Sequence, residues 1–176
     1  MTKVKFLSAI ILVITLSSFT ISNSISWNIA DDFSIKFISK NPSGVFTKLK
    51  GDVQFDKDNL AASKFDVKID VASINTGNGW KNKHAKGKKW FNAKEFPTIN
   101  FTSKSFKKTA TGFETTGILE MHGIKKELTM PFTFNNNTFK TTFTVDRTDF
   151  KIGKTTGMAK KVPREIKLDI SVPFTK

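Results

Sequence analysis

The sequence predicts an all-β protein, an extended antiparallel β-barrel of about eight to ten strands with one short helix in a crossing loop. Residues 94–134 alternate apolar and polar side chains in steps of two, which is the period of strands and not of helices. Small polar turns divide this stretch into three antiparallel strands. Closure into a barrel is expected because many strands in one small domain would otherwise leave exposed sheet edges.

The first part of the barrel is predicted from alternation and turn residues, in chain order. Strands are expected at residues 26–30 and 33–39, with a break at Asp31-Asp32. The turn Asn41-Pro42-Ser43-Gly44 leads into a single long strand over residues 45–56. Residues 64–72 form the next strand and show the most regular alternation in the chain.

Alternation stops between residues 73 and 94, where a crossing loop with a short helix over residues 79–88 is expected. The central hairpins then turn at residues 107–112 and at His122-Gly123. A strand is expected over residues 138–145, a loop over 153–163 and a last strand over 166–174. Asp146 and Asp149 flank Arg147, which predicts a turn held by ion pairs and hydrogen bonds.

Residues 1–22 have the pattern of a secretory signal peptide, so an exported protein in the periplasm or outside the cell is expected. Lys3 and Lys5 precede an apolar run over residues 6–19, and cleavage is expected after Ser22 or Ser24. The run is shorter than the roughly 20 apolar residues of a transmembrane helix, which argues against an uncleaved anchor. Residues 23–176 then form one domain.

Composition limits the classes of function. The chain has no cysteine, which excludes disulfides and thiol catalysis. It has 18 phenylalanines and no tyrosine, so its aromatic bulk lacks hydroxyl groups. Such rings suit a hydrocarbon-lined interior and equally an ordinary core. Removing Lys3 and Lys5 with the signal peptide takes the 29 basic side chains to 27, against 15 acidic ones.

The basic surplus gathers in two segments, and its interpretation stays open. Six lysines lie in residues 81–94, and four lysines and one arginine lie in residues 151–164. If both segments lie at one end of the barrel, they form a positive rim. Such a rim would hold the protein near an anionic membrane surface or contact a phosphate on a polyprenyl carrier. Ordinary solvated lysines are the alternative, and nucleic acid is not expected as a partner of an exported protein.

No pattern of catalytic or metal-binding residues is present, so neither an enzyme nor a cofactor is expected. His84 and His122 lie on different predicted elements and lack the spacing of metal ligands. The chain also lacks the GxSxG pattern of a hydrolase nucleophile. His84 is interpreted as a surface residue of the short helix and His122 as a turn residue; facing the mouth of a cavity would favour a binding role for His84.

Three segments together resemble the YceI-like family of bacterial lipid-binding proteins. They are FPTINFTS at residues 96–103, GILEMHGIKK at residues 117–126 and DRTDF at residues 146–150, and both their order and their spacing match. The sequence departs from the family pattern at Trp90, where Phe is more usual, and at Asn92, where Asp is. The resemblance covers about residues 26–174. It implies a lipocalin-like barrel whose interior holds a long isoprenoid or other lipid chain.

The function expected from this resemblance is non-catalytic binding or transport of a polyisoprenoid-type lipid, such as a quinone tail or a polyprenyl chain, in the barrel cavity. Alternation places a set of side chains on the inner face as candidate ligand contacts: Phe37, Phe65, Ile69, Phe101, Leu119, Phe132 and Phe143. His84, Trp90 and Phe91 are expected at the cavity mouth. The alternative is a filled barrel that acts as a cationic adaptor at the envelope or membrane surface.

Overall fold

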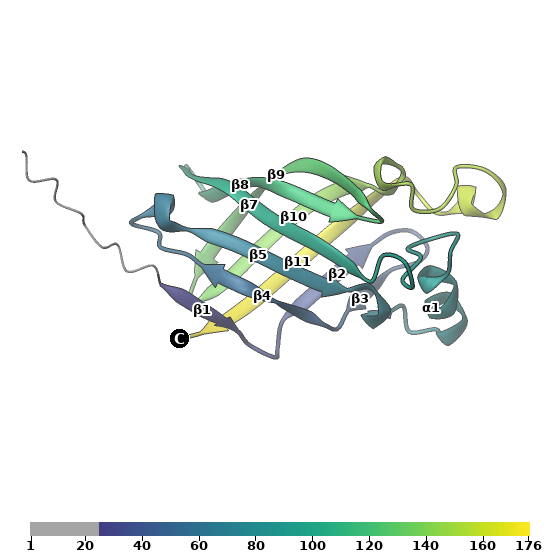
Figure 1. Cartoon of the computed structure of the whole chain (residues 1–176), viewed down its shortest axis with the longest axis horizontal. Helices are drawn as coiled ribbons and strands as arrows, with labels where there is room; N and C mark the ends of the chain where they lie inside the picture. Colours follow the sequence, from purple (N-terminus) through teal and green to yellow (C-terminus); the bar gives the residue numbers. More distant parts are fainter. Residues whose placement is uncertain (1–24) are drawn as a thin grey trace, which may run out of the picture.

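The computed structural model describes residues 25–176, apart from the side chain of Met158, so the predicted signal peptide lies outside the described residues. These residues form a closed antiparallel β-barrel with eight strand positions and one short helix (Figure 1). The all-β class and the barrel predicted from the alternation are confirmed. Around the ring the strands follow the order β1, β4, β5, β7, β8, β9, β10 and β11, and β11 pairs with β1 to close it.

Eleven strand segments fill the eight positions, because three positions are each built from two short segments. The divided positions are β1 (Ser26–Ile29) with β2 (Ser34–Ile38), β3 (Gly44–Phe46) with β4 (Leu49–Gln54), and β5 (Lys64–Asp70) with β6 (Ile74–Asn75). The continuous strands are β7 (Thr98–Thr109), β8 (Gly112–Met121), β9 (Ile124–Asn135), β10 (Thr138–Asp146) and β11 (Glu165–Thr175). Short 3-10 turns lie at Leu60–Ala62, Val71–Ser73, Arg147–Phe150 and Gly157–Lys161.

The prediction of one strand over residues 45–56 is wrong, because the chain leaves the ladder between β3 and β4. The backbone N–H groups of Thr47 and Lys48 each donate to the hydroxyl oxygen of Ser73, at 3.2 Å. Ser73 belongs to the 3-10 turn that separates β5 from β6. One buried hydroxyl therefore replaces the strand pairing at the level where both strands are interrupted.

The predicted helix is present as α1 (Gly79–Lys86), two residues shorter than expected. The side-chain oxygen of Asn78 accepts a hydrogen bond from the backbone N–H of Lys81 at 3.0 Å, which caps the helix N-terminus. Asn82 ties the helix to the preceding segment by accepting from the N–H and the hydroxyl of Thr76 at 2.8 and 2.7 Å. Within residues 25–176, no helix combines the length and the hydropathy that crossing a bilayer requires.

One end of the barrel is filled by phenyl rings. We call this group the aromatic cluster; its members are Phe55, Phe65, Phe106, Phe113, Phe132, Phe134 and Phe139. Phe55 is 2% exposed and has five other rings with centroids 4.8–6.1 Å away. The indole N–H of Trp27 donates to the carbonyl oxygen of Phe55 at 2.9 Å. This filled end lies on the side of the chain's C-terminus, opposite α1 (Figure 1).

Candidate functional site

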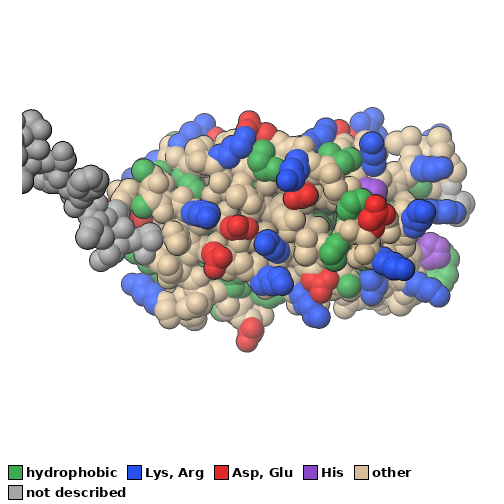
Figure 2. Space-filling view, viewed as in Figure 1, with side chains coloured by type: hydrophobic (Ala, Val, Ile, Leu, Met, Phe, Trp, Pro, Cys, Tyr) green, Lys and Arg blue, Asp and Glu red, His purple; other side chains and the backbone are tan. Residues whose placement is uncertain are grey.

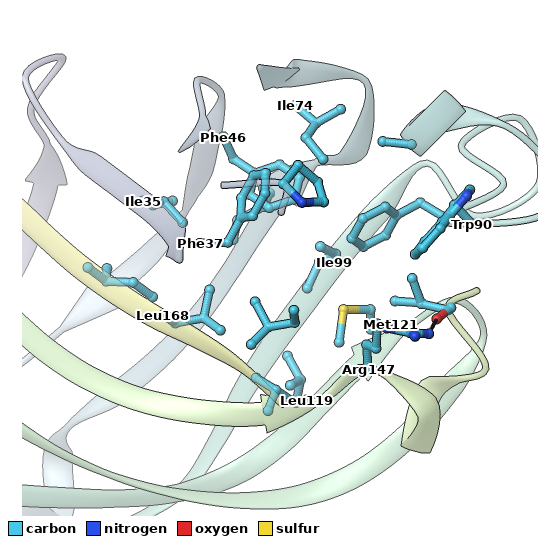
Figure 3. A pocket seen from close by; sticks show the side chains of 18 of the residues that line it. Ile35, Phe37, Phe46, Ile74, Trp90, Ile99, Leu119, Met121, Arg147 and Leu168 are labelled. Carbon is cyan, nitrogen blue, oxygen red and sulfur yellow. Dashed lines mark hydrogen bonds between the residues drawn. The ribbon is translucent and has the colours of Figure 1, made fainter. Parts of the chain in front are cut away.

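A cavity of about 830 Å³ occupies the barrel between the aromatic cluster and α1. Pockets that hold small ligands are typically about 300–1,000 Å³ and mostly apolar. Its wall consists of inward side chains from the strands, among them Ile35, Phe37, Ile69, Ile99, Phe101, Leu119, Met121, Leu128, Phe143, Leu168 and Ile170. In Figure 3 the labelled side chains from different strands point toward a common space.

The floor of the cavity is the inner surface of the aromatic cluster. Phe65 and Phe139 line the cavity, and behind them the ring of Phe132 lies 5.8 and 5.0 Å away, centroid to centroid. Phe65 and Phe139 themselves pack edge to face, with ring centroids 5.7 Å apart, so the three rings are in mutual contact. The cavity therefore ends at this layer.

A glycine keeps one aromatic ring against the wall. A Cβ atom at Gly117 on β8 would lie 2.6 Å from the ring of Phe101 and 2.5 Å from the carbonyl oxygen of Thr102. Because Gly117 has no side chain, the Phe101 ring can approach the backbone of β8 closely while it lines the cavity. A larger residue at Gly117 would push this ring toward the centre.

The mouth of the cavity is bordered by the crossing loop that contains α1. His84 stacks on Trp80, with ring centroids 3.9 Å apart, and both side chains line the cavity. Phe91 packs edge-on against Phe46, at 6.0 Å. The ring of Trp90 lies beside Gly153, where a Cβ atom would be 2.6 Å from it, so the crossing loop contacts the segment after β10.

Arg147 holds the segment after β10 in place by hydrogen bonds, and it also lines the cavity. It is 4% exposed, and its guanidinium group lies 5.4 Å from the centre of the Trp90 ring. The guanidinium N–H groups donate to five backbone carbonyl oxygens, those of Ile152, Lys154, Ala159, Val162 and Pro163, at 2.7–3.4 Å. Burial lowers the pKa of Arg147, and the neighbouring Asp146 carboxylate opposes that change.

The carboxylate of Asp146 pairs with Arg164 and not with Arg147. Its oxygens accept from the Nε and Nη2 groups of Arg164 at 3.0 and 2.7 Å, and from the N–H and hydroxyl of Thr148 at 2.8 and 2.6 Å. Burial alone would raise the pKa of Asp146, but these hydrogen bonds and the charge of Arg164 lower it to about 2. Asp149 pairs with Lys126 at 3.1 Å. The predicted turn is present, and its carboxylates do form ion pairs, but with Arg164 and Lys126; within the described part of the chain, Arg147 forms none.

Most of the side chains predicted from alternation lie on the cavity wall. Six of the seven do so, namely Phe37, Phe65, Ile69, Phe101, Leu119 and Phe143, and the mouth residues His84, Trp90 and Phe91 also border the cavity. Phe132 does not, because it lies in the aromatic cluster, one layer beyond the floor. Ligand contact by any of them stays a prediction.

Sequence reasoning missed Arg147 as a cavity residue. Its position between Asp146 and Asp149 predicted a turn held by ion pairs and hydrogen bonds, and charged residues are seldom fully buried. The available signal was the long polar segment after it, whose backbone carbonyl groups need donors when the segment folds over the barrel end.

A comparison with known sequences settles the family. The YceI-like domain profile matches residues 22–174. The chain belongs to the YceI-like family. Two curated relatives of this YceI-like protein are UPF0312 proteins: one from Yersinia enterocolitica is 36% identical over 87 residues, 49% of this chain and 45% of that protein. The other, from Photorhabdus laumondii, is 35% identical over 83 residues, 47% of this chain and 43% of that protein. The matched segment thus spans under half the length of these relatives.

Solved structures extend the match over most of the barrel of this YceI-like protein. BcnA of Burkholderia cenocepacia has a TM-score of 0.75 and 29% identity, covering 82% of this chain and 98% of that one. A YceI protein of Campylobacter jejuni has a TM-score of 0.65 and 26% identity, covering 78% and 86%. A polyisoprenoid binding domain from Saccharophagus degradans shares the fold, with a TM-score of 0.54 and 11% identity over 84% of this chain and 91% of that domain.

Proposed function

We propose that this YceI-like protein is exported and that it binds and carries a polyisoprenoid-type lipid, such as a quinone tail or a polyprenyl chain, without catalysing a reaction on it. The observation that supports the proposal is the apolar cavity of about 830 Å³ enclosed by the strands. A hydrocarbon chain gains free energy there because it leaves water without meeting unpaired polar groups. The polyisoprenoid binding of the Saccharophagus degradans domain, which has the same fold, supports the choice of lipid class.

The expected gain on binding is large enough for a short chain. Burial is worth roughly 0.8 kcal/mol per CH₂ group, so each five-carbon isoprene unit contributes about 4 kcal/mol before ordering costs. A lipid that fills the cavity with only a few such units would therefore bind firmly. The cavity of about 830 Å³ favours carriage over the alternative of a filled barrel that acts as a surface adaptor.

Leu119→Trp is the variant that tests carriage. Leu119 is 7% exposed and lines the cavity, so an indole there would occupy the space of the ligand. The matched control is Ile118→Trp, because Ile118 is the adjacent residue of β8 and alternation puts it on the outer face. We expect native mass spectrometry after gentle purification to find lipid on the wild type and on Ile118→Trp, and at least tenfold less on Leu119→Trp.

Two results would contradict the proposal. One is a wild-type protein that carries no lipid and whose melting temperature is unchanged by added isoprenoid quinone. The other is equal lipid content in Leu119→Trp and the control, provided that both variants keep the wild-type melting transition. Turnover of ester, glycoside or phosphate substrates above a denatured control would contradict the non-catalytic part.

A further inference from the structure

The positive charge of this protein is concentrated in two segments. Residues 71–94 and 150–164 hold eleven basic side chains and no acidic one. Of the 27 basic side chains that follow residue 22, this leaves 16 elsewhere, against 15 acidic ones. The rest of the chain is therefore nearly neutral, and the surplus is not a property of the whole surface.

Both segments lie at the same end of the barrel and contribute to the cavity itself. Figure 1 places α1 and the segment before β11 at the end opposite the C-terminus, and Figure 2 shows blue side chains gathered at that end. Four exposed lysines from the two segments border the cavity: Lys81, Lys89, Lys154 and Lys161. We call them the rim lysines. The buried guanidinium of Arg147 adds a fifth cation, and none of the described residues that line the cavity is Asp or Glu.

Among the described residues the rim lysines have no carboxylate partner, whereas several lysines on the barrel wall do. On the wall, Lys104 pairs with Glu127 at 2.8 Å and Lys107 with Glu114 at 2.6 Å. Within the part of the chain that the structure describes, none of the four rim lysines forms an ion pair. Lys81 donates a hydrogen bond to the amide oxygen of Asn41 at 3.0 Å, which is a neutral partner.

We infer that the ligand is an anionic amphiphile, with its hydrocarbon tail in the cavity and a phosphate or carboxylate head group among the rim lysines. The inference rests on the proposed function and specifies the ligand class. A neutral head group would leave the four rim lysines without an opposite charge at the mouth, whereas an anion offsets their mutual repulsion. Because the rim lysines are exposed, the attraction is screened by salt, while burial of the tail is not.

The experiment compares head groups on identical tails. Farnesyl phosphate is paired with farnesol, and palmitate with hexadecanol, and each is titrated into delipidated protein by calorimetry. We expect each anion to bind at least tenfold more tightly than its alcohol at low salt, and the ratio to fall as salt is added. The two pairs also distinguish the lipid class that supplies the anionic head group. A larger anion-to-alcohol affinity ratio for the farnesyl pair indicates a polyprenyl phosphate. A larger ratio for the palmitate pair indicates a fatty acid.

A matched pair of variants tests whether the rim lysines cause the preference for an anion over its alcohol. The rim variant combines Lys81→Gln, Lys89→Gln, Lys154→Gln and Lys161→Gln. The control combines Lys50→Gln, Lys64→Gln, Lys108→Gln and Lys140→Gln, which removes the same charge from exposed lysines away from the cavity. We expect the ratio of the affinity for the anion to the affinity for its alcohol to fall to nearly one in the rim variant. In the control variant this ratio should keep its wild-type value.

Failure of this inference and failure of the proposed function give different results. Equal affinity for anion and alcohol in the wild type, or an unchanged ratio in the rim variant, overturns the anionic head group and leaves lipid carriage intact. Absence of binding by all four amphiphiles overturns both. Binding to phosphatidylglycerol vesicles that depends on the rim lysines, without any preference between the soluble pairs, would assign the charge to a membrane surface and overturn the inference.

Discussion

The two ends of the barrel are built from the same alternation but have opposite interiors. At the filled end, the inward positions carry phenyl rings from β5, β7, β8, β9 and β10, and these rings meet across the barrel. At the cavity end, the inward positions of the same strands carry mainly Ile, Leu, Val and Met, which do not reach one another. An eight-stranded barrel is just wide enough to be filled by side chains or to hold one small ligand. Here one barrel does both.

The difference teaches that side-chain size, and not strand geometry, decides where the ligand space lies. At the filled end, the rings of Phe65 on β5 and Phe139 on β10 meet edge to face, 5.7 Å apart, although these strands lie on opposite sides of the barrel. At the cavity end, most inward side chains are smaller and aliphatic. The two ends therefore carry different tasks. The aromatic cluster supplies packing energy, and the cavity end gives up packing for room.

The largest expected effect is a difference in unfolding free energy between Phe→Ala changes at the two ends. Phe55→Ala removes a 2% exposed ring that contacts five others, so we expect a loss of about 3–5 kcal/mol in the free energy of unfolding. Phe143→Ala makes the same chemical change on the cavity wall, where one side of the ring already faces empty space. We expect it to cost under about 2 kcal/mol. Urea denaturation measures both, and equal losses would remove the distinction between the ends.

The next effect concerns the hydrogen bonds by which Arg147 holds the segment after β10 at the cavity end. Arg147→Lys keeps the charge but loses the planar fork that donates to five carbonyl groups. We expect a loss of at least about 2 kcal/mol, because buried carbonyl groups lose their donors. We also expect faster proteolysis within residues 150–164, while the backbone amides around Phe55 keep their protection from hydrogen exchange.

Arg164→Lys is the matched control for that experiment, because Arg164 is exposed and pairs with Asp146 at the surface. It should have a smaller effect on both proteolysis and unfolding. If the two variants behave alike, burial of the guanidinium group does not fasten the segment.

The smallest effect is a pH dependence confined to the cavity end. The pKa of Asp146 is about 2 in the folded protein and about 3.9 in an unfolded chain, so the ionised form stabilises the fold above pH ~4. This contribution of about 1–2 kcal/mol, after allowance for solvent screening, is lost as the pH falls from about 4 to about 2. Asp146→Asn should therefore be less stable than the wild type at pH ~6 and nearly equal to it at pH ~2. A constant difference in unfolding free energy across that range would contradict this assignment.

The barrel and its inner face were predictable because alternation is a local property of the chain. The strand over residues 166–174 was predicted from its alternation, and its apolar residues line the cavity: Ile166, Leu168, Ile170, Val172 and Phe174. Alternation does not give the depth of a residue along the barrel axis, which depends on strand tilt and stagger. For this reason Phe132 was correctly assigned to the inner face of the barrel, but it lies in the aromatic cluster and not beside the cavity.

The hydrogen bonds of Arg147 at the cavity end could not be predicted from the local sequence pattern. Arg147 meets carbonyl groups up to 16 residues further along the chain, so its burial depends on how residues 150–164 fold back. The break between β3 and β4 has a similar origin, because it depends on the hydroxyl group of Ser73, 26 residues after Thr47. Contacts of this length are fixed by the closed barrel and not by neighbouring residues.

The distribution of tryptophan gives this molecule a built-in optical reporter. With no tyrosine in the chain, near-ultraviolet excitation reaches three indoles. Trp80 and Trp90 border the cavity, whereas Trp27 lies at the far end, hydrogen-bonded to Phe55. Displacement of water from the entrance would shift the emission of the first two toward shorter wavelengths, while Trp27 serves as an internal reference, so loading can be followed without attaching a dye.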